Sequence, residues 1–175
     1  MSKKPIVEVK NLKISSNNNY LIRDLSFKVM PNEILGIIGE SGSGKSLTAL
    51  SIIDLIQYKG LKQEGEIMFN PNLIETEKEK NSKAKKREIA IIFQDPASYL
   101  NPSMKCGTQI MESIVGNEDK LDKALGLLKK VMMDEPEKSL NKYPHELSGG
   151  QQQRVMIAMA LACLLYTSDA ADDGS

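Results

Sequence analysis

The chain has 175 residues, of which 41% are hydrophobic and 26% are charged, the proportions of a globular protein and not of a disordered one. Lysine plus arginine and aspartate plus glutamate both number 23, so no net charge attracts the chain to nucleic acid. No apolar run approaches the ~20 residues that a membrane span needs, and Cys106 and Cys163 lack metal-site spacing and suit a reducing compartment, so we expect a soluble cytoplasmic domain.

The first part of the chain predicts three short strands. Residues 6–14 alternate between apolar and polar side chains, residues 21–29 do the same, and an asparagine-rich turn at 17–19 joins them. Residues 65–69 predict the third strand. Because a strand, loop and helix lie between the second and third, we expect an antiparallel subsheet packed against an α/β core.

That intervening unit contains the glycine loop Gly39-Glu40-Ser41-Gly42-Ser43-Gly44-Lys45-Ser46, with the spacing G-x-x-x-x-G-K-[ST]. The apolar run 34–38 predicts a buried parallel strand before it, and the periodicity of 47–56 predicts a helix after it. Glycines let the backbone approach phosphates, Lys45 offers a charge to the β- and γ-phosphates, and Ser46 offers a hydroxyl to Mg²⁺. The flanks therefore favour a nucleoside triphosphate site over an ordinary Gly/Ser turn before a helix.

The middle of the chain begins with a charge-dense stretch. Residues 75–87 interleave lysine with glutamate and hold no aromatic side chain, which favours a solvated connector over a nucleic-acid patch. Residues 89–93 predict a buried strand that ends at Gln94. Two short helices should follow within a helical subdomain at about 96–150, the first near 109–114. The apolar stripe of the second is Leu121, Leu125, Leu128 and Met132.

A second corner suited to anions begins the last helical stretch, at Ser148-Gly149-Gly150-Gln151. Ser148 is a good N-cap, and backbone N–H groups, a small hydroxyl and a positive helix end meet there. The residues leave two interpretations open. Either this is an ordinary capped helix, or it completes the nucleotide site of a neighbouring subunit in a head-to-tail dimer.

Three segments together resemble the ATP-binding subunit of an ABC transporter: residues 39–46, 92–96 and 143–151. The sequences of residues 98–102 and 154–161 are similar to those of the peptide/nickel import branch of this family. The resemblance covers about residues 6–162. It implies an α/β fold with a P-loop NTPase core of the ABC ATPase type. An N-terminal antiparallel β-subdomain and an inserted helical subdomain belong to that fold, which we expect to be incomplete at the C-terminus.

The resemblance implies roles for the matched residues. Gly39–Ser46 would bind the phosphates of ATP, and Ser46 and Gln94 would contact Mg²⁺. Ser148–Gln151 would clamp the γ-phosphate held by the opposite subunit. The implied partners are a second ATP-binding subunit, integral membrane permease subunits and, indirectly, an extracytoplasmic solute-binding protein, at the cytoplasmic face of the membrane and without nucleic acid.

The chain departs from the family at the aromatic residue that stacks on adenine. Family members place it about 23 residues before the first loop glycine, where this chain has Ser16. We expect Tyr20, in the adjacent turn, to substitute for it. The alternative is an ordinary turn tyrosine.

A second departure concerns catalysis. The family needs an apolar strand that ends in Asp-Glu after the signature helix and then a switch histidine, and nothing suitable follows Leu161. The single histidine, His145, precedes the signature. Residues 131–136 and 89–95 contain carboxylates but match other parts of the family pattern. We therefore assign no catalytic residue in this chain, and we expect weak ATP binding and negligible hydrolysis.

Residues 163–175 are small and acidic at their end and show no apolar periodicity. They resemble a translated adaptor of sequencing libraries, so we expect the helix to break at Cys163, the tail to be non-native and the natural gene to continue. A genuine disordered tail is the alternative.

The sequence therefore predicts the ATP-binding subunit of an importer for peptides or for nickel and metal chelates. One alternative is a soluble ABC-type ATPase acting on nucleic acid or ribosomes, which the short span of about fifty residues between Gln94 and Ser148 disfavours. A phosphate-loop kinase or GTPase is disfavoured by the Ser148–Gln151 corner. A nucleotide-binding fragment that does not hydrolyse ATP is the remaining alternative.

Overall fold

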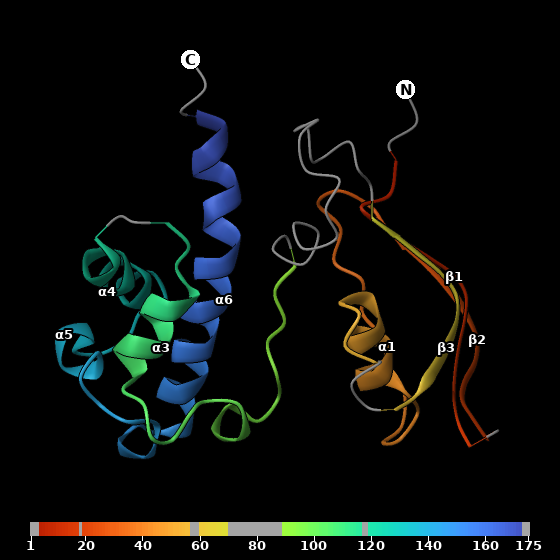
Figure 1. The fold of residues 1–175 in the computed structure, drawn as a ribbon, viewed down its shortest axis with the longest axis horizontal. Helices are drawn as coiled ribbons and strands as arrows, with labels where there is room; N and C mark the ends of the chain where they lie inside the picture. The colour runs from red at the N-terminus through yellow and green to blue at the C-terminus, as the bar shows by residue number, and fades with distance from the viewer. Residues whose placement is uncertain (1–3, 18, 57–59, 70–88, 117–118, 173–175) are drawn as a thin grey trace. The chain divides into compact units, whose positions relative to one another are not determined.

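The computed structural model describes residues 4–17, 19–56, 60–69, 89–116 and 119–172, so the charged stretch 75–87 lies outside the described residues. The chain divides into two compact units, residues 1–80 and 81–175, and each is described by itself. The first unit contains β1 (Val7–Ser16), β2 (Asn19–Val29), α1 (Lys45–Ile52) and β3 (Lys62–Phe69) (Figure 1). The second contains the 3₁₀ turn η3 (Pro96–Ser98), α3 (Cys106–Ser113), α4 (Lys120–Lys130), α5 (Pro136–Ser139), the 3₁₀ turn η4 (Pro144–Glu146) and α6 (Gly149–Asp172).

The first unit is built on an antiparallel sheet of order β2-β1-β3. The central strand β1 buries Val9, Leu12 and Ile14 almost completely, because its apolar side chains face inward between both neighbours. Helix α1 lies on the concave side of this sheet (Figure 1). The antiparallel hairpin is as predicted, whereas β3 begins at Lys62, three residues earlier than we expected.

The apolar run 34–38 is not the buried strand that we predicted. It has no regular secondary structure, and the side chains of Ile34 and Ile38 are 99% and 98% exposed. A strand requires a hydrogen-bonded neighbour, and the paired strands of the first unit are β1, β2 and β3. A run of exposed apolar side chains of this kind is an aggregation-prone surface.

The second unit has a helical core between α3, α4 and α6. Its central buried side chains include Ile110, Leu128 and Val155. The predicted stripe on α4 is partly wrong, because Leu121 is 56% exposed and Met132 is 76% exposed. Leu128 is buried as predicted, but its buried companions on the helix are Ala124 and Leu127, and the helix ends at Lys130, before Met132.

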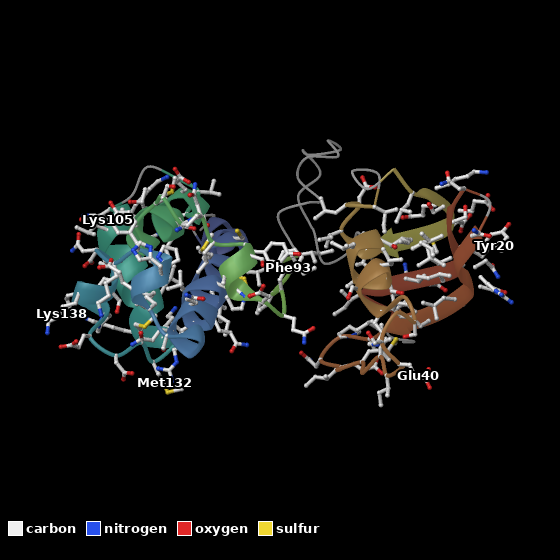
Figure 2. All side chains as sticks on the ribbon, turned by 90° about the horizontal axis from the view of Figure 1, so that it is seen from below. Tyr20, Glu40, Phe93, Lys105, Met132 and Lys138 are labelled. Atoms are coloured by element: carbon white, nitrogen blue, oxygen red, sulfur yellow. The ribbon has the colours of Figure 1, made fainter. Side chains whose placement is uncertain are left out.

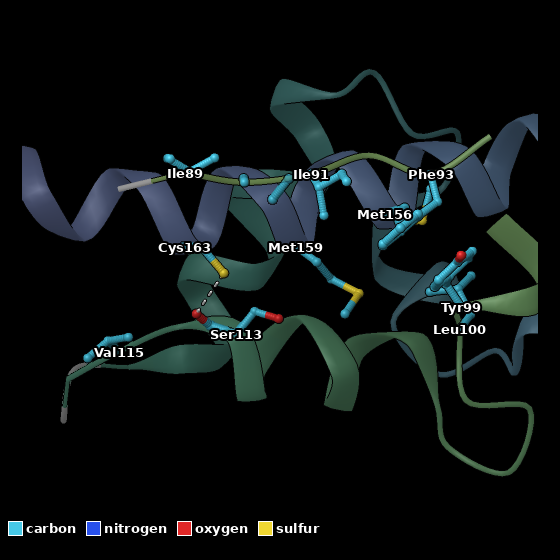
Figure 3. Close-up of a pocket in the computed structure, with 12 residues that line it drawn as sticks. Ile89, Ile91, Phe93, Tyr99, Leu100, Ser113, Val115, Met156, Met159 and Cys163 are labelled. Atoms are coloured by element: carbon cyan, nitrogen blue, oxygen red, sulfur yellow. Dashed lines mark hydrogen bonds between the residues drawn. The ribbon is translucent and has the colours of Figure 1, made fainter. Parts of the chain in front are cut away.

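Two further expectations in the second unit are corrected. Residues 89–93 do not form a strand; Ile89, Ile91 and Phe93 instead line an apolar groove of about 390 Å³ beside α6 (Figure 3). Helix α6 does not break at Cys163 but continues to Asp172, over a stretch whose leucine and alanine residues favour helix.

The two cysteines lie in the second unit, Cys106 at the start of α3 and Cys163 within α6. Both cysteines are free, and burial, with a smaller contribution from the Glu146 charge, raises the pKa of the Cys106 thiol to about 11. That thiol therefore stays protonated at neutral pH and acts as an apolar core group. Among the described residues, no helix is long and apolar enough to cross a membrane.

A buried glutamine fixes the loop that leads from η3 into α3. The Gln109 side chain, 5% exposed, accepts a hydrogen bond from Asn101 N at 2.9 Å. Its Nε2 donates to the carbonyls of Asn101 and Met104 at 3.0 and 2.9 Å. Without these bonds Asn101 N and Met104 O would lose these partners, and Asn101 O would keep only the bond from Met104 N.

Replacement of Gln109 by alanine should therefore lower the free energy of unfolding of the second unit by roughly 2–3 kcal/mol. Urea unfolding followed by circular dichroism measures the change. The matched control is Gln153→Ala, which removes an exposed glutamine on α6. Equal stabilities for the two variants would contradict this role of Gln109.

Candidate nucleotide-binding site

The glycine loop in the first unit closes around the Lys45 ammonium group. Lys45 Nζ donates to the carbonyls of Gly39 and Glu40 at 2.7 and 2.6 Å, and it lies 3.4 Å from Ser43 Oγ. Ser43 N in turn donates to Glu40 O at 3.2 Å, which forms a tight turn. The positive charge is thus held at the centre of the loop by the loop's own backbone.

The glycines of the loop are required by this geometry. A Cβ on Gly39 would lie 2.6 Å from Ser43 Oγ, and Gly42 has a φ of +81°. Gly44 has a φ of +93°, and a Cβ there would lie 2.9 Å from Ile22 Cγ1 on β2. Larger residues would therefore strain the turn or push the loop away from the sheet.

Helix α1 presents its N-terminus to the loop. Gly44 is its N-cap residue, and Thr48 N donates to Gly44 O at 2.8 Å, so the N–H groups before Thr48 precede the first helical bond. Ser46 stands in this first turn with an exposed side chain. N–H groups, a lysine charge and an exposed hydroxyl together form a site that suits a phosphate chain with its cation.

Tyr20 is also in the first unit and is 54% exposed at the start of β2 (Figure 2). It pairs with Ser15, while Ser16 pairs with Asn19. The strand itself reaches the loop, because Leu21 O lies 3.5 Å from the Cβ position of Gly44. Tyr20 is therefore two residues from the loop contact made by Ile22.

The Ser148–Gln151 corner lies in the second unit and forms a reciprocal cap at the start of α6. Ser148 N donates to Gln151 Oε1 at 3.1 Å, and Gln151 N donates to Ser148 Oγ at 3.3 Å. This confirms the predicted N-cap. Among the described residues the Ser148 hydroxyl accepts one bond, in the cap, and donates none, so its proton can go to a further acceptor.

Nothing in the structure of the described residues requires glycine at positions 149 and 150. A Cβ on either would meet no atom within 4 Å, and neither has a positive φ. Glycine in a helix costs about 0.5–1 kcal/mol relative to alanine. The exposed backbone at this corner is therefore suited to close approach by a group from outside these residues.

Gln94 is exposed in the segment between Phe93 and η3. The carboxylates to which we assigned no catalytic role are not at strand ends. Asp95 caps η3 by accepting from Ala97 N at 3.2 Å. Asp134 lies 3.8 Å from Arg154 Nη1, and Glu135 forms an ion pair with Lys138, which lowers the pKa of the Glu135 carboxyl.

The sequence did not predict two residues whose side chains hold the turn before α6 by hydrogen bonds to its backbone. Gln152 Nε2 donates to the carbonyls of Pro144 and Leu147 at 2.8 and 3.3 Å and so fixes the turn that leads to Ser148. Glu146 Oε2 accepts from Tyr143 N at 2.7 Å in the same turn. In the sequence, Glu146 and Gln152 cannot be told from glutamate and glutamine side chains that only face solvent. Their hydrogen bonds to the backbone become evident only in the folded turn.

Comparisons with known proteins agree with these motifs. A family model described as ABC transporter matches residues 22–165. The chain is 46% identical over 146 residues to a probable peptide ABC transporter ATP-binding protein of Sinorhizobium fredii, a match that covers 79% of this chain and 44% of that protein. It is 45% identical over 149 residues to a dipeptide transport ATP-binding protein of Haemophilus influenzae, with the same shares covered.

A solved structure described as the dimeric structure of a bacterial ABC transporter cassette is also similar. Its identity to this chain is 27%, the TM-score is 0.62, and the likeness covers 90% of this chain and 69% of that one. The chain spans about half the length of the curated relatives that it matches.

Proposed function

We propose a function from the premise that this chain belongs to the ABC transporter family, as one of its ATP-binding proteins, because the family model matches residues 22–165. The whole protein is the ATP-binding subunit of an importer, in which ATP binding and hydrolysis drive the uptake of peptides. Nickel or metal chelates are the second candidate solute. The relatives are named as peptide and dipeptide transport proteins, and these names favour peptides as the solute.

The observation that carries ATP binding is the closed loop around Lys45. Its ammonium, held by Gly39 O and Glu40 O, lies where the β- and γ-phosphates would meet backbone N–H groups. The exposed Ser46 hydroxyl suits Mg²⁺, which binds few protein ligands and keeps several waters, and Gln94 is the second proposed ligand. Bound Mg²⁺ would neutralise phosphate charge for the hydrolysis step.

We assign the adenine contact to Tyr20. Its half-exposed ring stands two residues from Ile22, whose side chain approaches Gly44 in the phosphate loop. An exposed aromatic ring at this distance along the strand suits stacking on a base. Ser16, at the usual family position, has no ring to offer.

The Ser148–Gln151 corner serves a second subunit. Two copies, or this chain and a related one, associate head to tail so that Ser148 Oγ and the N–H groups of Gly149 and Gly150 clamp the γ-phosphate held by the partner. The open space above both glycines supports this role. The dimeric cassette among the similar structures is consistent with it.

The Gly150→Ala substitution tests the role of this corner in dimerisation without lowering the stability of the fold. We expect the variant to be as stable as the wild type or more so, by up to about 1 kcal/mol. It should fail to form the dimer that we expect the wild type to form with ATP, as measured by sedimentation velocity. Gly126→Ala, at an equally open position in α4, is the matched control and keeps the dimer. A Gly150→Ala chain that dimerises with ATP as the wild type does would remove the clamp from the mechanism.

The remaining partners are permease subunits in the membrane and, through them, an extracytoplasmic solute-binding protein. The protein then works at the cytoplasmic face of the membrane, and nucleic acid has no part. Residues 162–175, which follow Leu161, contain no Asp-Glu pair and no histidine. We therefore propose that this chain alone binds ATP weakly and does not turn it over.

Uptake by cells tests the transport function. A chromosomal Lys45→Ala substitution should abolish the uptake of labelled dipeptides and oligopeptides and leave the uptake of free amino acids unchanged. Loss of nickel uptake with normal peptide uptake would favour the second solute. Normal uptake of both would contradict the importer assignment.

A further inference from the structure

The junction between the phosphate loop and helix α1 is Gly44. Its φ of +93° turns the chain from the loop into the helix. Because this N-cap residue is a glycine, no cap side chain takes up the N–H groups of the first helical turn. The position of Gly44 therefore sets where those N–H groups lie.

The helix side of Gly44 is held by Thr48. Thr48 N and Thr48 Oγ1 both donate to Gly44 O, at 2.8 and 3.0 Å. The Thr48 side chain is 2% exposed, so the bond from its hydroxyl is made away from water. Gly44 cannot move away from α1 without breaking these two hydrogen bonds.

The sheet side of Gly44 is held by Ile22 on β2. A Cβ on Gly44 would lie 2.9 and 3.3 Å from Ile22 Cγ1 and Cδ1, so the Gly44 Cα itself is within contact distance of this side chain. Ile22 is 8% exposed and pairs with Ile14, which is fully buried on the central strand. The isoleucine is therefore fixed by the sheet, and the loop packs against it.

We propose that Ile22 is a positioning residue of the phosphate site, whose side chain holds Gly44 where the N–H groups of the first turn of α1 meet the phosphates. This inference rests on the proposed ATP site. A smaller side chain would leave a space into which Gly44 can move, because the surroundings of a new cavity partly relax into it. A side chain of the same volume but different branching would press on the loop instead, because the contact has no spare room.

The test measures the affinity of the purified 175-residue chain for ATP and for inorganic tripolyphosphate, both with Mg²⁺, by displacement of a fluorescent ATP analogue. We expect Ile22→Ala to weaken the binding of both ligands by about threefold to tenfold, the equivalent of one hydrogen bond. Ile22→Val keeps a carbon at the Cγ1 position and should restore the wild-type affinity. Ile22→Leu keeps the side-chain volume and so the fold, and it should weaken both ligands.

Leu12→Ala is the matched control. It removes the same number of carbon atoms as Ile22→Ala from a fully buried position on β1, but Leu12 contributes none of the three atoms nearest the Gly44 Cβ position. It should lower the free energy of unfolding as Ile22→Ala does and leave the affinity of the folded chain unchanged. This comparison separates positioning of the loop from a contribution to stability alone.

Wild-type affinity in both Ile22→Ala and Ile22→Leu overturns the inference, as does an equal loss of affinity in Leu12→Ala. A loss for ATP without a loss for tripolyphosphate also overturns it, because the contact would then act on the nucleoside. If Ile22→Ala does not fold, Ile22→Leu decides. Failure of the proposed function is distinct, because Lys45→Ala would then bind both ligands as the wild type does.

Discussion

Replacement of Lys45 by alanine is expected to weaken ATP binding by the purified chain roughly thirtyfold to a hundredfold. The substitution removes the positive charge at the centre of the proposed phosphate site, and it also frees the carbonyls of Gly39 and Glu40 that the ammonium now joins. Loss of charge and loss of loop closure act in the same direction. Isothermal titration calorimetry or displacement of a fluorescent analogue measures the change.

The matched control is Lys62→Ala. Lys62 belongs to the same unit and pairs with Glu64 on the exposed sheet edge at 3.0 Å, so its loss should leave ATP affinity unchanged. Lys45→Arg separates charge from geometry, because the guanidinium fork does not fit the compact site of an ammonium and should restore little affinity. Equal ATP affinity in the wild type and in Lys45→Ala would contradict the proposal that this loop binds the phosphates of ATP.

Gly65→Ala should be the most damaging single substitution for folding of the first unit. Gly65 has a φ of +99°, and a Cβ there would lie 2.5 Å from Asn11 O and 2.7 Å from Lys10 O. Both atoms are backbone atoms of the central strand, so neither can rotate away. We expect a loss of roughly 3–5 kcal/mol in the free energy of unfolding of this unit.

Amide hydrogen exchange along β1 reports this loss, because the strand pairs with both neighbours. Two other glycines of the same unit serve as controls. Gly60 has a positive φ but open space, and Gly36 has open space without a positive φ. Exchange should therefore rise most in Gly65→Ala, less in Gly60→Ala and least in Gly36→Ala. Equal effects would contradict the backbone contact.

The parts of the structure that the sequence predicted well are determined by interactions between residues close together in the sequence. The spacing of Gly39–Ser46 determines a closed loop before a helix, and alternation in 6–14 and 21–29 determines a hairpin. The cap at Ser148 needs only the three residues that follow it. In each case the energy that selects the structure is contained in a short segment.

The errors occurred where the structure depends on a partner distant in sequence. The runs 34–38 and 89–93 have the composition of buried strands, but a strand forms only beside another strand. The Phe93–Tyr99 stack depends on the turn at η3, which no periodicity reports. The roles of Tyr20 and Gln94 in nucleotide binding remain proposals, because they require a ligand to reveal them.

Isolation of the native protein from its cells tests most directly the claim that it powers a transporter. Membranes are solubilised in mild detergent, the protein is captured with an antibody raised against residues 1–175, and its partners are identified by mass spectrometry. We expect integral membrane permease subunits together with an ATP-binding subunit in stoichiometric amounts. Recovery with ribosomes or nucleic acid and without any membrane protein would contradict the transporter assignment.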